Sequence, residues 1–342
     1  MVKKVKQKKI VWVVSDGIPG HFNQSKGVLF ALEILFDLDV YWIDLKLRNS
    51  YLRRLLAFIL NFNIPKLSKI KYFYRLSLLP NNQPDIVIGA GGNVSYAVAW
   101  LARAKCAKNI FCGSLRHLKK DLFDVVLVLE PNMLPPFISL TVSAMPLSQR
   151  ILSLASKNWV KEHSDIQCVV WTMLVGGDGA GAKYTISDWE NLAKQMNLLA
   201  EQNNISWFVS TSRRTGVEAE RALKGILKPE YIIDTVWWSE QPRQVLHAFL
   251  GLSERVYCGA DSMSMMMESL AAQRKLVVYH PECFKPDTKF QGVLTHLQKK
   301  SFIQLIPISE VDRASGVLEK LKVLDYEPSE KLAELLNERL FS

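Results

Sequence analysis

The sequence predicts an α/β protein made of two βα halves, each with a parallel sheet covered by helices. The chain has 342 residues, a length that suits two α/β domains or one large one. Short apolar runs alternate with helical patterns from end to end, and glycine-rich loops follow several of these runs. Alternation of this kind favours parallel strands with both faces buried.

The first half contains the apolar runs that predict its strands. They are Ile10–Val14, Val40–Ile43, Asp85–Ile88, Asn109–Cys112 and Val125–Leu129. Helical patterns lie between them, for example over Gln24–Phe36 and Val94–Ala104.

The second half repeats this scheme. Its predicted strands are Gln167–Leu174, Ser206–Ser210, Tyr231–Asp234, Glu254–Cys258 and Lys275–Tyr279. A helix is predicted between Ser187 and Ala200, and Ser187 and Glu190 have the spacing of a capping box at its start.

The domain boundary is predicted in Met145–Ser164, which has no strand pattern, several serines and few large apolar side chains. The expected domains are therefore residues 1–150 and residues 165–325. A C-terminal helix is expected in residues 326–342, because Ser329–Leu340 has an amphipathic pattern.

Composition narrows the class of protein. The formal net charge of +10 favours an anionic partner, such as a phosphorylated substrate, an acidic membrane or nucleic acid. The five cysteines are odd in number and include no C-x-x-C pair, which argues against disulfides and structural zinc. We expect them to be buried thiols in a reducing cytosol. No apolar stretch is long enough to span a membrane, and Ile10–Val14 is too short for a signal peptide, so a soluble or peripheral protein is expected.

Glycine-rich loops follow three of the predicted strands. They are Ser15–His21, Gly89–Ser95 and Val175–Gly181. Ligands of open α/β sheets bind at the carboxyl ends of strands, where glycine lets backbone N–H groups approach a phosphate. A tight turn can also use glycine for steric reasons alone, but three such loops in two halves favour a nucleotide site. None matches the P-loop pattern, which disfavours a P-loop NTPase.

A fourth segment, Cys258–Leu270, ends a strand and starts a helix capped by Asp261 or Ser262. Ser264 and Glu268 are four residues apart and share a helix face. That face can offer hydroxyl and N–H groups to a diphosphate and a carboxylate to a ribose. The alternative is a well-capped core helix whose methionines pack in the interior.

A fifth segment, Ser210–Thr215, also follows a predicted strand and contains Arg213 and Arg214. Arginines at the end of a strand can hold phosphate oxygens in bidentate fashion. A solvated loop is the alternative.

The stretch from Leu45 to Pro84 contains no acidic residue and mixes basic with aromatic side chains. Such a surface is typical of a membrane interface, where each basic residue near an anionic bilayer contributes roughly 1 kcal/mol. The residues expected to face the membrane are Arg53, Arg54, Phe58, Phe62, Lys69 and Lys71. Ordinary packing of the apolar side chains is one alternative, and nucleic acid is another that the lack of any recognised nucleic-acid motif disfavours.

Four segments carry a family resemblance. They are Ser15–Ser25, Gly176–Asp178, Ser212–Thr215 and Ala260–Met265. Together they resemble the bacterial branch of the mitochondrial-fission family, which is named for elongated mitochondria and whose bacterial members are treated as glycosyltransferases. More distantly, Ile88–Ser95 and Asp261–Glu268 resemble the second glycine loop and the donor-binding helix of the N-acetylglucosaminyltransferase that makes lipid II.

The resemblance implies a GT-B fold, in which two Rossmann-like domains with parallel sheets face each other across a cleft. The donor would bind the C-terminal domain through Gly176, Gly177, Ser212, Arg213, Asp261, Ser262, Ser264 and Glu268. The acceptor would bind an N-terminal loop set of Gly17, Gly20, Gly91, Gly92 and Asn93. Asp16 and His21 are the candidates for the general base. Helix dipoles and backbone N–H groups would stabilise the leaving diphosphate, so no obligatory metal and no cofactor are expected.

The expected function is therefore transfer of a sugar, with inversion, from a nucleotide-sugar donor to a lipid-linked envelope acceptor such as a lipopolysaccharide-type glycan. The protein would work in the cytoplasm, peripherally on the inner membrane, without binding nucleic acid. Two alternatives stay open: a nucleotide-sugar 2-epimerase of the same fold, and a non-enzymatic adaptor at a membrane. One departure from the family pattern is Asp178, whose charge would oppose a phosphate unless the side chain turns away.

Overall fold

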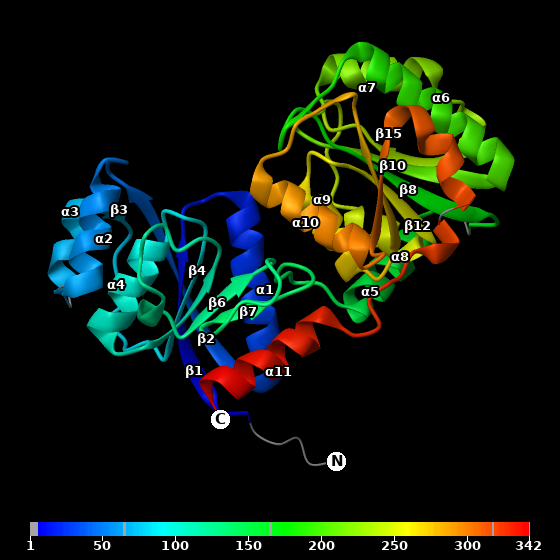
Figure 1. The fold of residues 1–342 in the computed structure, drawn as a ribbon. Helices are drawn as coiled ribbons and strands as arrows, with labels where there is room; N and C mark the ends of the chain where they lie inside the picture. Colours follow the sequence, from blue (N-terminus) through cyan, green and yellow to red (C-terminus); the bar gives the residue numbers. More distant parts are fainter. Residues whose placement is uncertain (1–5, 64–65, 164–165, 317, 342) are drawn as a thin grey trace. The chain divides into compact units, whose positions relative to one another are not determined.

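The protein is described by a computed structural model that covers residues 6–63, 66–163, 166–316 and 318–341. The chain divides into two compact units. Unit 1 comprises Met1–Pro146 and Pro328–Ser342, and unit 2 comprises Leu147–Glu327. Each unit is built around a mainly parallel sheet with helices on both faces (Figure 1).

Unit 1 contains a 7-stranded sheet in the order β3-β2-β1-β4-β5-β6-β7. The strands are β1 (Lys8–Ser15), β2 (Asp37–Leu47), β3 (Tyr74–Leu76), β4 (Ile86–Ala90), β5 (Lys108–Cys112), β6 (Val125–Val128) and β7 (Phe137–Ser139). All neighbours are parallel except β3, which runs antiparallel to β2. The helices are α1 (Pro19–Leu35), α2 (Leu52–Phe62), α3 (Ile70–Phe73), α4 (Ser95–Lys105) and α11 (Pro328–Leu340).

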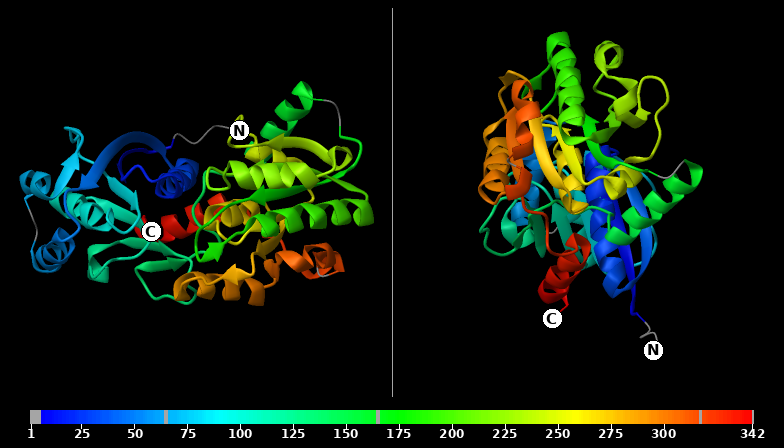
Figure 2. Two further views of the ribbon diagram at one scale, coloured as in Figure 1. Left: turned by 90° about the horizontal axis from the view of Figure 1, so that it is seen from above. Right: turned by 90° about the vertical axis from the view of Figure 1, so that its right-hand side faces the viewer.

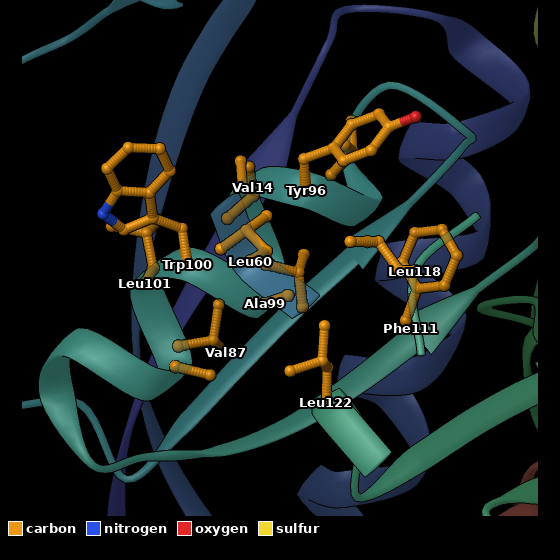
Figure 3. Close-up of a cluster of buried hydrophobic side chains, with 14 of the residues drawn as sticks. Val14, Leu60, Val87, Tyr96, Ala99, Trp100, Leu101, Phe111, Leu118 and Leu122 are labelled. Carbon is orange, nitrogen blue, oxygen red and sulfur yellow. The ribbon is translucent and has the colours of Figure 1, made fainter. Parts of the chain in front are cut away.

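The side chains of β1 show how this sheet is covered. Trp12 and Val14 pack on one face against α2 and α4. Val11 and Val13 pack on the opposite face against α1 and α11, because successive side chains of a strand point to opposite sides. Figure 3 shows part of the first cluster, in which Val14 lies among side chains of α2 and α4. Burying one such side chain fully stabilises the fold by roughly 1.5–3 kcal/mol.

The C-terminal helix α11 returns to unit 1, although it follows all of unit 2 in the sequence. It packs beside α1, and Leu332 and Leu336 of α11 are buried in the same cluster as Val28 and Leu32 of α1. Figure 1 and Figure 2 show this helix in red. Unit 1 is therefore completed by both ends of the chain.

Unit 2 contains a 6-stranded parallel sheet in the order β11-β10-β8-β12-β13-β15, and β14 pairs with β9 in a separate ribbon. The strands are β8 (Val169–Val175), β9 (Ala182–Lys183), β10 (Ile205–Thr211), β11 (Ile232–Val236), β12 (Arg255–Gly259), β13 (Lys275–His280), β14 (Cys283–Phe284) and β15 (Ile303–Pro307). The helices are α5 (Gln149–Glu162), α6 (Ile186–Asn203), α7 (Val217–Ile226), α8 (Leu246–Leu252), α9 (Met263–Ala271) and α10 (Thr288–Lys299). The strand order of the main sheet is that of a Rossmann fold.

The capping box of α6 differs from the predicted one. The side chain of Thr185 accepts from the N–H of Asp188, and the Asp188 carboxylate accepts from the N–H of Thr185. The predicted pair, Ser187 and Glu190, lies inside the helix because α6 begins at Ile186. The prediction of the helix was right, and its first turn was placed two residues too late.

The cysteines also differ from expectation. Cys112 and Cys258 are buried, whereas Cys106, Cys168 and Cys283 are exposed, and all of them are free thiols. The exposed ones lie at the end of α4, just before β8 and in the β14 ribbon, where the chain runs along the surface. Among the helices that the structure describes, none is long and apolar enough to cross a membrane.

Candidate functional site

Each sheet has one point at which the strand order reverses direction. It lies between β1 and β4 in unit 1 and between β8 and β12 in unit 2. Ligands of doubly wound sheets bind outside the carboxyl ends of the strands at this switch point. Apart from Ser212 and Arg213, which follow β10, the predicted donor and acceptor residues lie in the loops after these four strands or in the helices that follow those loops.

In unit 1, Asp16 lies in the loop after β1, and His21 lies in the first turn of α1. The His21 Nδ1 atom lies 3.0 Å from Oδ2 and 3.1 Å from Oδ1 of Asp16. Asp16 also accepts a hydrogen bond from the N–H of Ile18, and Gly17 takes the turn with a φ of 76°. Because a carboxylate only accepts, a neutral ring in this position would carry its proton on Nδ1 and have its lone pair on Nε2. The pair therefore has the arrangement of an oriented general base.

The second loop of unit 1, Gly91–Asn93, lies against this pair. A side chain at Gly91 would overlap the ring of His21, and Gly91 has a φ of 91° that favours glycine. Asn93 is fixed on both sides: its Oδ1 accepts from Arg53 Nε at 3.0 Å, and its carbonyl accepts from the Tyr74 hydroxyl at 2.8 Å. The structure thus brings the predicted residues Gly91 and Asn93 into one site with His21. Of the other predicted loop residues, Gly17 makes the β1–α1 turn and Gly20 lies in the first turn of α1.

Two arginines at this loop were not predicted to be there. Arg53 had been expected to face a membrane, but its side chain reaches Asn93 and is half-buried. Arg116 follows β5, and a side chain at Gly92 would overlap its guanidinium. The sequence signal for Arg116 is its place after a strand of the same sheet. For Arg53 no signal separates it from Arg54, because only packing decides which side of α2 faces the loop.

In unit 2, the buried carboxylate of Asp261 organises the loops. It accepts from the N–H of Gly177 at 3.1 Å, from the Tyr184 hydroxyl at 3.0 Å and from Arg214 Nη2 at 2.7 Å. Burial raises the pKa of Asp261, and the hydrogen bonds from Gly177 and the Arg214 charge oppose that rise. All of these groups belong to the protein, so Asp261 positions its neighbours rather than offering a free oxygen to a ligand.

The glycines after β8 are required by this packing. A side chain at Gly176 would overlap the Asp261 carboxylate, and one at Gly177 would overlap the carbonyl of Arg214. The N–H of Gly177 is already given to Asp261. Asp178 turns its carboxylate to the N–H of Tyr184, at 2.9 Å, and so faces its own loop. These residues therefore hold the loops of unit 2 together.

The free polar groups of unit 2 lie on two neighbouring segments. Arg213 is exposed and makes no ion pair or hydrogen bond within the described part of the chain, whereas Arg214 is bound to Asp261. Ser212 uses its hydroxyl in the turn, where it accepts from the N–H of Arg214. Arg213 is therefore the cation that a phosphate could bind.

Helix α9 supplies the other free groups. Ser262 caps the helix by accepting from the N–H of Met265. Ser264 is exposed in the first turn, and Glu268 is half-buried one turn later. Burial raises the pKa of Glu268 to about 7, and its carboxyl group makes no hydrogen bond or ion pair with another side chain or backbone group among the described residues. Met266 and Met267 are fully buried, so the helix both packs in the core and presents a polar face.

Across residues 6–63, 66–163, 166–316 and 318–341, no group of three or more His, Cys, Asp or Glu side chains is arranged to hold a metal ion.

A comparison with family models identifies the chain. The model described as Mitochondrial fission ELM1 matches residues 19–340. The chain belongs to this family. Among curated proteins, no sequence matches the chain.

Solved structures resemble the chain over nearly its full length. The UDP-GlcNAc 2-epimerase from Methanocaldococcus jannaschii has a TM-score of 0.58 at 12% identity and covers 97% of this chain and 100% of its own. The Neisseria meningitidis UDP-GlcNAc 2-epimerase bound to UDP-GlcNAc has a TM-score of 0.54 at 10% identity, covering 98% of this chain and 99% of its own. The glycotransferase of kitacinnamycin has a TM-score of 0.52 at 13% identity, covering 98% of this chain and 100% of its own. At these identities the likeness shows the fold, which is GT-B, as the sequence predicted.

Proposed function

We propose that this protein transfers a sugar from a nucleotide-sugar donor to a lipid-linked acceptor of the cell envelope. The observation that carries the proposal is the division of chemistry between the two units. Unit 1 has an Asp16–His21 pair at its switch point. Unit 2 has Ser264 and Glu268 on the helix after β12 and Arg213 in the loop after β10, and none of these side chains bonds to another group among the described residues. Glycosyl transfer with inversion needs a general base that deprotonates the acceptor and a binding site for the nucleotide of the donor.

In the proposed reaction, Arg213 and the N-terminal end of α9 hold the diphosphate of the donor. A guanidinium and the positive end of a helix dipole both stabilise the negative charge that grows on the leaving group. Ser264 adds a hydroxyl donor, and Glu268 accepts hydrogen bonds from the ribose hydroxyls. Asp261 holds the loop through Gly177 and Arg214.

On the acceptor side, His21 Nε2 takes the proton of the acceptor hydroxyl while Asp16 stabilises the imidazolium that forms. The acceptor oxygen then bonds to the anomeric carbon, and the bond from that carbon to the diphosphate breaks. The nucleoside diphosphate leaves with the bonding electron pair. Attack from the side opposite the leaving group inverts the anomeric centre.

The lipid-linked nature of the acceptor rests on the surface around α2. Phe58 and Phe62 are 63% and 66% exposed, and their ring centroids are 5.2 Å apart. Arg54 is exposed on the same helix, and Lys69 and Lys71 are exposed on the short turns that follow it in the sequence. We define this set of five residues as the α2 surface. Exposed aromatic rings beside basic side chains support docking on an anionic bilayer.

A nucleotide-sugar epimerase is the second candidate, because epimerases are among the proteins of similar fold. The α2 surface favours the transferase, since an epimerase acts on a soluble molecule and has no use for a bilayer. One experiment separates these functions. The protein is incubated with nucleotide sugars, with and without membrane glycolipid, and the products are analysed by mass spectrometry and NMR.

The proposal predicts nucleotide release and a heavier glycolipid only when glycolipid is present. Interconversion of the sugar without glycolipid would assign the epimerase instead. No turnover of any nucleotide sugar under either condition would favour the adaptor function.

A further inference from the structure

Two arginines from different elements converge on the Gly91–Asn93 loop. Arg53 comes from the first turn of α2, and its Nε donates to Asn93 Oδ1 at 3.0 Å. Arg116 comes from the loop after β5, and its guanidinium lies so close to Gly92 that a side chain there would overlap it. Both arginines thus border one short loop, which begins beside the ring of His21.

Tyr96 lies close to the loop that carries Arg116. Its hydroxyl donates to the carbonyl of Arg116 at 3.0 Å, and Figure 3 shows that hydroxyl pointing out of the apolar cluster. Burial raises the pKa of Tyr96, and the positive charges of Arg116 and Arg53 both oppose that rise. The two guanidiniums border the neighbouring residues Gly92 and Asn93, and an anion bound between them would offset the repulsion of their like charges.

No carboxylate neutralises this pair in the described part of the chain. Neither arginine takes part in an ion pair, and Leu45 to Pro84 contains no acidic residue. The acid of this site, Asp16, is bound to His21 instead. Two planar guanidiniums beside a glycine loop suit a tetrahedral oxyanion, because each can donate two parallel hydrogen bonds to it.

We propose that Arg53 and Arg116, together with the Gly91–Asn93 loop, bind a phosphate group carried by the acceptor. That the phosphate belongs to an acceptor rests on the proposed function, whereas the phosphate site itself rests on the contacts of Arg53 and Arg116 with the loop. The site adjoins His21, so the phosphate would lie close to the hydroxyl that reacts. Helix α2 carries Arg53 on its inner side and Phe58 on its exposed side, which suits an acceptor whose phosphate is near its lipid.

The test uses inorganic phosphate as the probe and the ring signals of ¹³C-labelled histidine as the readout. His21 is assigned by comparison with His21→Gln, and its signal reports on unit 1 alone at constant pH. Phosphate should shift the His21 signal saturably. Arg53→Gln and Arg116→Gln should each weaken this binding roughly tenfold or more, since each removes charge-assisted hydrogen bonds. Arg75→Gln, which removes an exposed guanidinium from β3 of the same unit, should leave it unchanged.

Melting curves check that each variant is folded. A His21 signal that does not respond to phosphate, or equal affinity in wild type and Arg116→Gln, would overturn the proposal. Vesicles of phosphatidylcholine with phosphatidylglycerol distinguish the other source of phosphate. Arg116→Gln should bind them as wild type does, and a loss of vesicle binding in this variant would assign the pair to bilayer headgroups instead. Nucleotide binding is measured in parallel, so a protein that binds phosphate in unit 1 but no nucleotide would contradict only the proposed function.

Discussion

At the scale of single residues, Glu268 is the most informative side chain of unit 2. Its carboxyl group is half-buried and has no partner in the part of the chain that the structure describes, and burial raises its pKa to about 7. Its pKa in the unfolded chain is about 4.3. The folded protein therefore holds the proton more tightly than the unfolded chain between these two values, and stability falls as the pH rises through this window.

Replacing Glu268 by Gln should remove this pH dependence. We expect the wild type to lose stability relative to Glu268→Gln as the pH is raised from about 4.5 to about 7, with no further relative change above it. Urea unfolding of both proteins at several pH values measures the difference. A constant difference across the whole window would mean that the carboxyl is not desolvated.

The Asp16–His21 pair gives a prediction about rate. Loss of a general base typically lowers the rate by about 10²–10⁴. His21→Ala should show a decrease of that size, and Asp16→Asn should be impaired because the amide can stabilise the wrong tautomer of the imidazole. Donor binding should be unchanged in both variants. Full turnover in both would place the base elsewhere and leave this loop as a turn.

At the scale of elements, the unit 2 loops depend on glycines whose place a side chain cannot take. Gly176→Ala would push a methyl group into the Asp261 carboxylate and should destabilise the protein by about 1–3 kcal/mol. Gly225→Ala is the control. It lies in α7 with open space around it, and replacing a helical glycine by alanine should stabilise by roughly 0.5–1 kcal/mol. Thermal unfolding of the two variants should show shifts of opposite sign.

The α2 surface gives a prediction about membranes. Changing Arg54, Lys69 and Lys71 to glutamine should abolish most of the preference for anionic over neutral vesicles, and added salt should do the same to the wild type. Phe58→Ser should weaken binding at all salt concentrations without lowering the melting temperature, because the ring is 63% exposed. Vesicle co-sedimentation measures both effects. Equal partitioning of wild type and the triple variant onto anionic vesicles would refute the peripheral-membrane proposal.

Strands and the loops after them could be predicted from the sequence, because buried parallel strands are continuous apolar runs. The runs at Ile10–Val14 and Asp85–Ile88 correspond to β1 and β4, which flank the switch point of unit 1. The first residues of helices were harder to predict from the sequence than the strands. Helix α1 begins at Pro19, several residues before the predicted Gln24, because glycine and histidine in its first turn hide the helical pattern. Helix α5 went unrecognised since only Leu152 and Trp159 of its side chains are buried.

Roles inside the site were less predictable than its location. The sequence could not show that the Asp261 carboxylate accepts hydrogen bonds from Gly177, Tyr184 and Arg214, because these partners come from distant loops. The sequence also could not place Arg53 beside the Gly91–Asn93 loop. Such assignments depend on which residues the fold brings together, and spacing along one helix carries no information about them.

At the scale of the whole molecule, the chain belongs to the Mitochondrial fission ELM1 family and has the GT-B fold. Both ends of the chain complete unit 1, and the whole of unit 2 is inserted between α11 and the rest of unit 1. Each unit carries candidate site residues after the strands that flank the switch point of its own sheet. The proposed transfer reaction requires unit 2 to bind a nucleotide at α9.

Calorimetric titration with UDP, GDP, ADP and CMP tests this most directly. We expect saturable binding of at least one nucleotide, and Glu268→Ala should weaken it by about 1.5–3 kcal/mol, the value of hydrogen bonds to a charged group. Arg213→Gln should weaken it as well. Glu230→Ala, which removes an exposed carboxylate elsewhere in unit 2, should bind as the wild type does. If no nucleotide binds the wild type, or if folded Glu268→Ala and Arg213→Gln bind with unchanged affinity, the nucleotide-sugar transferase account is contradicted.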